Sequence, residues 1–173
     1  MSRLRLRRPR TTLGELRPRR NERSLLFCLA LPLAVGLLAS LLTRQGMLAY
    51  AEMEKPLLAP PGWVFPVVWT ALYLLMGLAS WRVARSPAPE EGKGTALGLY
   101  AVSLAANFLW PLLFFGLGRY WMAFAALLAL LILVLLTWDR FRRLDRGAGV
   151  LLLPYLLWLC FAAYLNLGAA ILN

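Results

Sequence analysis

Apolar runs long enough to cross a lipid bilayer recur along this chain of 173 residues. A membrane-spanning helix needs about 20 consecutive apolar residues, and several runs reach that length. Hydrophobic residues make up 61% of the sequence and charged residues 16%, and the mean hydropathy of +0.65 is too high for a soluble domain of this size. We therefore predict an all-α membrane protein, a bundle of five transmembrane helices at about residues 25–43, 63–83, 95–115, 120–138 and 150–172.

Polar stretches divide the chain into an N-terminal arm and one transmembrane domain, residues 25–173. The arm, residues 1–24, is rich in arginine and contains two prolines, so we expect it to be disordered or to lie on the membrane surface. Residues 44–62 form the longest loop between spans. The run 25–43 is long and lacks a clear small-residue cleavage site, which favours a first span over a signal peptide cleaved near Ala39.

Lysine and arginine lie mostly on one side of the predicted membrane, and they produce the net charge of +11. The arm and the loops around 84–94 and 139–149 hold nine, three and four of them, whereas the intervening loops and the C-terminus hold two, one and none. Because basic residues concentrate on the cytoplasmic side, we predict a cytoplasmic N-terminus, with the 44–62 loop and the C-terminus on the opposite side. Topology explains this charge better than base recognition does, so no nucleic-acid partner is expected.

The sequence lacks the residues that several kinds of chemistry require. There is no histidine, which excludes imidazole metal ligands and histidine-dependent triads, and we expect neither a metal nor a bound cofactor. Cys28 and Cys160 both fall in predicted spans and form no metal-binding or disulfide motif. The spans also lack paired carboxylates and central Lys or Arg residues, which disfavours a proton-coupled transporter or an ion channel.

Aromatic and amide side chains recur on one face of three predicted spans. Trp69 and Tyr73 are four residues apart in 59-APPGWVFPVVWTALYLLMG-77, and so share a helix face. The same holds in the third span for Ser103, Asn107, Trp110 and Phe114, and in the fifth for Tyr155, Trp158, Ala162 and Asn166. The alternative is ordinary helix packing, with Asn107 bonding between helices. Three such faces together favour a pocket for a flat, apolar, π-rich ligand.

Three motifs resemble those of the translocator protein family, also called the tryptophan-rich sensory protein (TspO) or peripheral-type benzodiazepine receptor family. They are the loop and second span 55-KPLLAPPGWVFPVVWTALYLLMG-77, the third-span motif 107-NFLWPLLFFG-116 and the fifth-span motif 154-PYLLWLCFAAYLN-166. They occur in the family's order and spacing over about residues 25–173. The sequence departs from the family pattern at Leu58, Ser103, Leu167 and Ile171. The last two disfavour sterol recognition of the proposed kind.

The resemblance implies an often dimeric five-helix bundle whose pocket is closed on one side by the first loop. Family ligands include porphyrins, cholesterol and synthetic isoquinoline or benzodiazepine compounds. The ligand-binding residues that it implies are Tyr50, Trp69, Tyr73, Asn107, Trp110, Trp158 and Ala162.

Three functions remain open from the sequence. The first is binding of a porphyrin-like ligand for sensing, transport or regulation. The second is a light- and oxygen-dependent chamber for porphyrin breakdown, although the spans show no acid–base pair, so we expect no conventional catalytic residues. The third is a partner protein or homodimer formed through small residues of the third span, Gly94, Gly98, Ala101 and Ala105.

Overall fold

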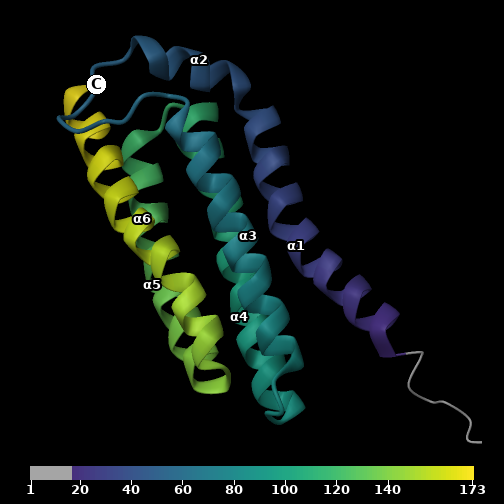
Figure 1. The fold of residues 1–173 in the computed structure, drawn as a ribbon. Coiled ribbons are helices and arrows are strands. Elements are labelled where there is room, and N and C mark those ends of the chain that lie inside the picture. The colour runs from purple at the N-terminus through teal and green to yellow at the C-terminus, as the bar shows by residue number, and fades with distance from the viewer. Residues whose placement is uncertain (1–16) are drawn as a thin grey trace, which may run out of the picture.

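The computed structural model of the chain describes residues 17–173, so most of the predicted arm lies outside the described residues. The described part is helical and contains no strand. Five long helices and one short one are joined by short connections, and a π-helical turn follows the third long helix (Figure 1). The elements are α1 (Arg17–Leu42), α2 (Arg44–Glu52), α3 (Val64–Arg85), α4 (Glu90–Pro111), η1 (Leu112–Gly116), α5 (Tyr120–Leu144) and α6 (Arg146–Leu172).

Within residues 17–173, five helices are long and apolar enough to cross a membrane, which confirms the predicted all-α bundle: α1, α3, α4, α5 and α6. Most run further than predicted. α1 begins at Arg17, so residues 17–24 are helical rather than part of a disordered arm, and the proline at position 18 sits in the first turn, where its missing N–H costs nothing. α4, α5 and α6 likewise extend into charged residues, because helical backbone remains stable beyond the apolar core, where water solvates charged side chains.

The segment predicted as a loop, residues 44–62, contains a helix that the sequence analysis missed. α2 has nine residues, includes Gly46, and has no side-chain cap at its N-terminus. Such a helix is marginal by itself, so packing must stabilise it. It lies across one end of the bundle, beside the C-terminus (Figure 1), whereas α1 begins at the opposite end.

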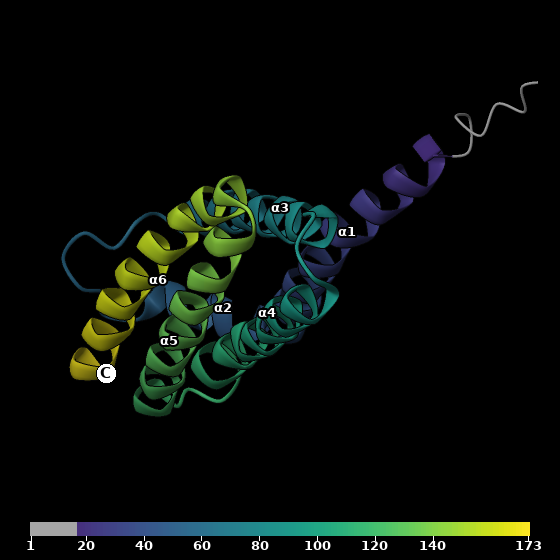
Figure 2. The same cartoon turned by 90° about the horizontal axis from the view of Figure 1, so that it is seen from below.

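The spans form a ring when viewed along the bundle (Figure 2). α3 packs between α1 and α6, α5 packs against α4 and α6, and α1 also contacts α4. The helices approach most closely where side chains are small. At Gly77 of α3 an added Cβ would lie 2.6 Å from the Cys28 carbonyl oxygen of α1, so only glycine allows this contact. Met76, Ala79 and Val83 nearby are completely buried.

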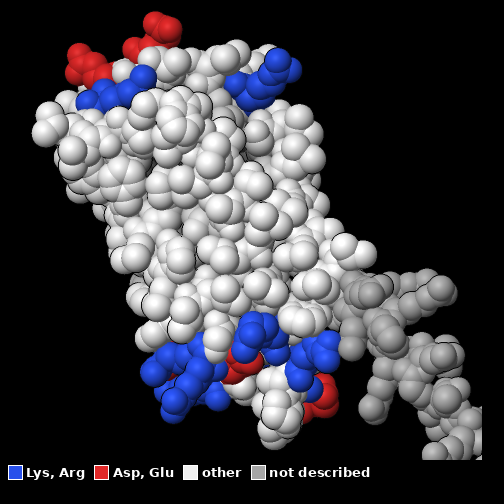
Figure 3. Space-filling view, in the orientation of Figure 1, with Lys and Arg blue, Asp and Glu red and all other residues white. Residues whose placement is uncertain are grey.

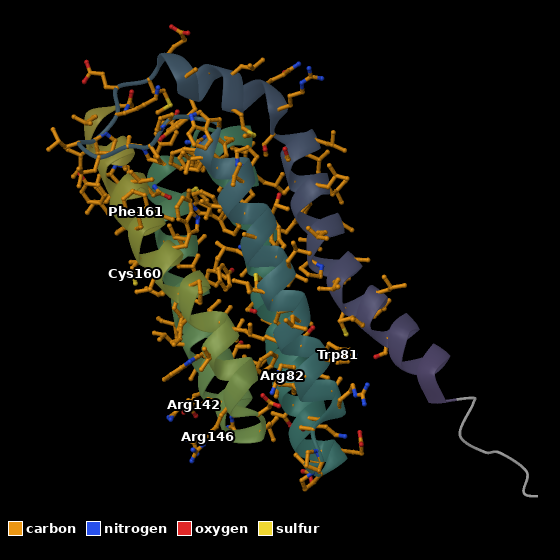
Figure 4. All side chains as sticks on the ribbon, viewed as in Figure 1. Trp81, Arg82, Arg142, Arg146, Cys160 and Phe161 are labelled. Atoms are coloured by element: carbon orange, nitrogen blue, oxygen red, sulfur yellow. The ribbon has the colours of Figure 1, made fainter. Side chains whose placement is uncertain are left out.

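Charged side chains gather at the two ends of the bundle and leave an apolar band between them (Figure 3). The end opposite α2 holds Arg82, near the end of α3 (Figure 4), whose guanidinium donates to both carboxylate oxygens of Asp145 at 3.0 and 3.1 Å. Asp145 also caps α6 by accepting from the backbone N–H of Ala148 at 2.7 Å. The Arg82 guanidinium holds the pKa of the Asp145 carboxyl below its ordinary value.

A candidate aromatic ligand pocket

A pocket rich in aromatic side chains lies inside the bundle beneath α2. Its cavity has a volume of about 20 Å³, enough for roughly one water molecule. Five of the seven residues predicted to bind ligand line it. The full lining is Tyr50, Phe65, Trp69, Trp110, Phe114, Phe115, Trp158, Ala162, Leu165 and Asn166.

Trp69 lies at the centre of this aromatic cluster. Its ring centroid is 6.4 Å from those of both Trp110 and Trp158, and the Trp158 ring meets it nearly at a right angle. On the same helix, Tyr73 lies 5.4 Å from Trp69, the arrangement predicted from their four-residue spacing. Such tilted and edge-to-face pairs are favourable aromatic geometries, so the rings of α3, α4 and α6 support one another.

The other two predicted residues, Tyr73 and Asn107, do not line the cavity but connect three helices just beyond it. The Tyr73 hydroxyl donates to Asn107 Oδ1 at 2.9 Å, and Asn107 Nδ2 donates to the Tyr155 hydroxyl at 2.8 Å. Asn107 and Tyr155 are almost completely buried. Polar groups within a bilayer must find partners inside the protein, and this chain supplies them.

A second hydrogen-bonded chain holds Trp110 in place. Its indole Nε1 donates to Asn166 Oδ1 at 2.9 Å, and Asn166 Nδ2 donates to the backbone carbonyl of Tyr120 at 2.9 Å. The bonds tie together α4, α6 and the start of α5. Trp110 is therefore fixed both by packing and by a polar bond.

Trp158 is held differently, although it faces the same cavity. Its Nε1 is buried and has no hydrogen-bond partner among the described residues. Only ring contacts position it, with Phe65 at 6.1 Å, Trp69 at 6.4 Å and Phe161 at 5.6 Å between centroids. An unpaired buried N–H is costly, so this indole has a donor available to a ligand oxygen.

The π-helix η1 places two neighbouring phenylalanines at the pocket. Pro111 ends the regular hydrogen bonding of α4, and the N–H of Leu117 bonds to the carbonyl of Leu112, five residues earlier. Phe114 and Phe115 both line the cavity as a result, with ring centroids 4.8 Å apart. π-Helical turns frequently occur at functional sites.

The α2 lid closes the pocket by resting directly on η1. An added Cβ at Gly46 would lie 1.7 Å from the Phe115 carbonyl oxygen, so glycine is required for this contact. From α2, Tyr50 reaches Phe65, Phe114 and Phe115 at 6.2, 5.9 and 5.6 Å between centroids. Burial raises the pKa of the Tyr50 phenol, which therefore stays neutral at physiological pH.

The segment after α2 is fastened to the C-terminal end of α6. Pro56 packs closely against Gly168, where an added Cβ would lie only 2.5 Å from the Cβ of Pro56. The Tyr164 hydroxyl donates to the Leu57 carbonyl, and Asn173 Nδ2 donates to the Glu54 carbonyl at 3.1 Å. The lid is thus attached both to η1 and to α6.

Sequence reasoning recovered the rings on α3, α4 and α6 but missed several neighbours. Asn166 and Phe114 lie on the predicted faces but are not among the ligand-binding residues that the resemblance implies. Phe115 lies off the predicted α-helical face, and it lines the cavity from within the π-turn. The role of Tyr120 could not be read from its side chain, because its backbone carbonyl makes the contact.

Comparison with known proteins places this arrangement in a family. The family model described as TspO/MBR family matches residues 28–172, a range that contains every residue of the pocket lining. The chain belongs to the TspO/MBR family. This family is the one that the three sequence motifs resemble, and its members are membrane proteins built as helical bundles.

Curated relatives of this TspO/MBR chain come from distant organisms. It is 46% identical to a tryptophan-rich sensory protein of Cereibacter sphaeroides over 124 residues, 72% of this chain and 76% of that protein. It is 35% identical to the tryptophan-rich protein TspO of Chlorobaculum tepidum over 151 residues, covering 87% and 96% of the two chains. A translocator protein of Ovis aries is 38% identical over 123 residues, covering 70% and 73%.

Proposed function

We propose that this TspO/MBR protein binds a flat, apolar, porphyrin-like ligand in the aromatic pocket, for sensing, transport or regulation. The observation that carries the proposal is the set of three indoles, Trp69, Trp110 and Trp158, around one cavity within the membrane. Aromatic faces stack on planar π-systems, and each such pair adds about 1 kcal/mol beyond burial. Isoquinoline- or benzodiazepine-like compounds and sterols are the other ligand classes that family resemblance suggests.

The chemistry of the lining supports binding rather than acid–base catalysis. Among the ten side chains that line the cavity, Tyr50 is the only ionisable one, and burial keeps it neutral. The free Nε1 donor of Trp158 suits a ligand with a carbonyl or carboxylate oxygen. The proposal needs no metal, and protoporphyrin is expected to bind at least as well as haem, because the sequence has no histidine for iron.

The small cavity means that side chains must move when a ligand binds. A volume of about 20 Å³ is far below that of ordinary ligand pockets, about 300–1,000 Å³. The space is filled by the rings of Tyr50, Phe65 and Trp158. Phe65 meets the other two through edge-to-face ring contacts. Ligand binding is therefore expected to displace these rings, while the bonded Trp110 stays in place.

Quenching of tryptophan fluorescence by protoporphyrin IX tests the proposal. Ala162→Phe fills the cavity and should weaken binding about tenfold or more, a loss of about 1.4 kcal/mol. Ala129→Phe is the matched control, since Ala129 faces lipid on α5 away from the pocket. Trp158→Phe should weaken binding less. Equal affinity in wild type, Ala162→Phe and Trp158→Phe would mean that the porphyrin only partitions into the detergent micelle.

We also propose a cytoplasmic N-terminus, with α2 and the C-terminus on the opposite side. Basic side chains predominate at the end that holds the α3–α4 and α5–α6 turns, as cytoplasmic ends do (Figure 3). Anionic lipid headgroups would be the partners of these side chains. A reporter fused after Asn173 that gives a cytoplasmic signal would contradict this orientation.

We propose that the protein forms a homodimer through α4. Gly94, Gly98, Ala101 and Ala105 form an exposed stripe on this helix, and Gly94 and Gly98 have no neighbour within 4 Å of an added Cβ. Small residues let transmembrane helices approach closely. Crosslinking of Gly98→Cys in lipid should give dimers, whereas Ala129→Cys on α5 should not.

A further inference from the structure

A second cavity opens from the lipid-facing side of the bundle, between α3 and α6. It has a volume of about 510 Å³, and the side chains that line it are all aliphatic or aromatic. Val67 and Leu157 at its mouth are 60% and 71% exposed, so the mouth faces the surrounding lipid. We name it the α3/α6 groove, and its lining is Val67, Val68, Ala71, Leu72, Leu75, Pro154, Leu157, Trp158 and Phe161.

The groove, unlike the aromatic pocket, has the volume of a ligand-binding site. Ordinary ligand sites measure about 300–1,000 Å³, a range that includes the groove but not the pocket of about 20 Å³. A flat apolar ligand dissolves in the bilayer and approaches from the membrane. The groove is therefore a ligand-sized space that it can enter from the membrane.

One residue, Trp158, lines both cavities. Phe161 lies on its groove side, and Phe65 and Trp69 lie on its pocket side. Its buried Nε1 has no partner, so no hydrogen bond opposes a rotation of this indole. Trp110, on the far wall of the pocket, is held by its bond to Asn166. Phe161 lies on the upper half of α6, nearer to the lid than Arg146 (Figure 4).

The other sides of the pocket are closed by contacts that a ligand would have to break. At the lid, the backbone of Gly46 rests on the Phe115 carbonyl, and Tyr50 packs among three rings. Toward α5, Asn166 bonds to the Tyr120 carbonyl. Toward the opposite end, Asn107 joins two tyrosine hydroxyls across the bundle.

We propose that the α3/α6 groove is the membrane-side access site of the aromatic pocket, and that Trp158 moves aside to admit a flat apolar ligand. This inference rests on the proposed function, because the ligand of the groove is the ligand of the pocket. Once the indole has moved, its free N–H can donate to a carbonyl or carboxylate oxygen on that ligand. The route leaves the lid closed throughout.

The test measures the rates of protoporphyrin IX binding and release in nanodiscs of phosphatidylcholine. Ala71→Phe narrows the groove without touching the pocket lining, because Ala71 is exposed and lines only the groove. Association and dissociation should both slow about tenfold while Kd stays unchanged, because a narrowed route lowers both rates equally. Ala129→Phe puts the same side chain on lipid-facing α5 and should leave both rates unchanged.

The outcomes separate this inference from the proposed function. Rates of Ala71→Phe equal to those of Ala129→Phe, with saturable binding intact, would overturn the access route alone and point to passage through the lid. A weaker Kd with an unchanged association rate would overturn it too, because the groove would then be the binding site. Absence of saturable binding in the wild type would overturn both proposals. Val67→Phe, at the groove mouth, should slow binding and release in the same way. Agreement between the two variants would show that the slowing does not come from misfolding of one of them.

Discussion

The two halves of the bundle meet the same requirement, helices packed within a membrane, in different ways. In the half away from α2, small side chains bring the backbones together, as at Gly77 against Cys28, and Ala79 and Val83 leave no exposed surface. In the half beneath α2, bulky rings fill the space between the helices and meet edge to face. Asn107 and its two tyrosines lie between these halves.

The difference indicates which half is built to change. Close backbone contact cannot be adjusted, since there is no side chain to rotate. Rings positioned only by one another can rotate when a ligand replaces their contacts, and Trp158 has no hydrogen bond to lose. We therefore expect substitutions in the small-residue half to change stability and substitutions in the aromatic half to change ligand binding. The following experiments test this division.

The largest effect is expected at the α1–α3 contact. Gly77→Ala places a methyl group 2.6 Å from the Cys28 carbonyl, and the two backbones must separate. Overpacking of this kind costs about 1–3 kcal/mol, and the upper end is expected because backbone atoms cannot rotate away. Thermal unfolding of purified protein in detergent should show it. Gly92→Ala is the control, because its nearest neighbour would be 3.7 Å away, and a similar loss in both variants would contradict the explanation.

The sequence predicted some parts of the bundle and not others. The spans follow from hydropathy, and the 3.6-residue period predicts the helix faces that carry Trp69, Asn107 and Trp158. Both signals depend only on local sequence. Helix α2 and the π-turn η1 do not, because both depend on contacts between segments far apart in the chain, such as Gly46 on Phe115. The same reason hid the difference between the bonded Trp110 and the unbonded Trp158.

The polar junction between the halves should give the next largest effect. Asn107→Leu leaves the hydroxyls of Tyr73 and Tyr155 without their partner, at a cost of about 2 kcal/mol for the two groups. Unfolding in detergent measures the loss. The triple variant that also carries Tyr73→Phe and Tyr155→Phe removes the unpaired hydroxyls and should recover part of the stability. Equal losses in the single and triple variants would show that the amide acts by shape alone.

The lid should affect ligand exchange more than stability. Gly46→Ala places a methyl group 1.7 Å from the Phe115 carbonyl oxygen and so must lift α2 away from η1. We expect protoporphyrin IX to dissociate about tenfold faster, because Tyr50 loses its place among the rings and a barrier lowered by 1.36 kcal/mol gives that factor. Gly62→Ala is the control in the same segment, with nothing within 4 Å of the added Cβ. Equal dissociation rates in both variants would contradict a closing role for α2.

The smallest effect is expected at the charged end, where Arg82 and Asp145 join α3 to the start of α6. Asp145→Asn keeps a good helix cap but removes the charge, and an exposed pair of this kind contributes at most about 1 kcal/mol. Because Arg82 lowers the pKa of Asp145 in the folded protein, the pair stabilises fully above the ordinary aspartate pKa of 3.8 and loses its effect as the pH falls through the lower folded value. The gap in unfolding temperature between wild type and Asp145→Asn should therefore be present at pH 7 and close in acid below about pH 4. A gap that persists unchanged in acid would assign the effect to cap geometry, and the charged end would then resemble the small-residue half in depending on fit alone.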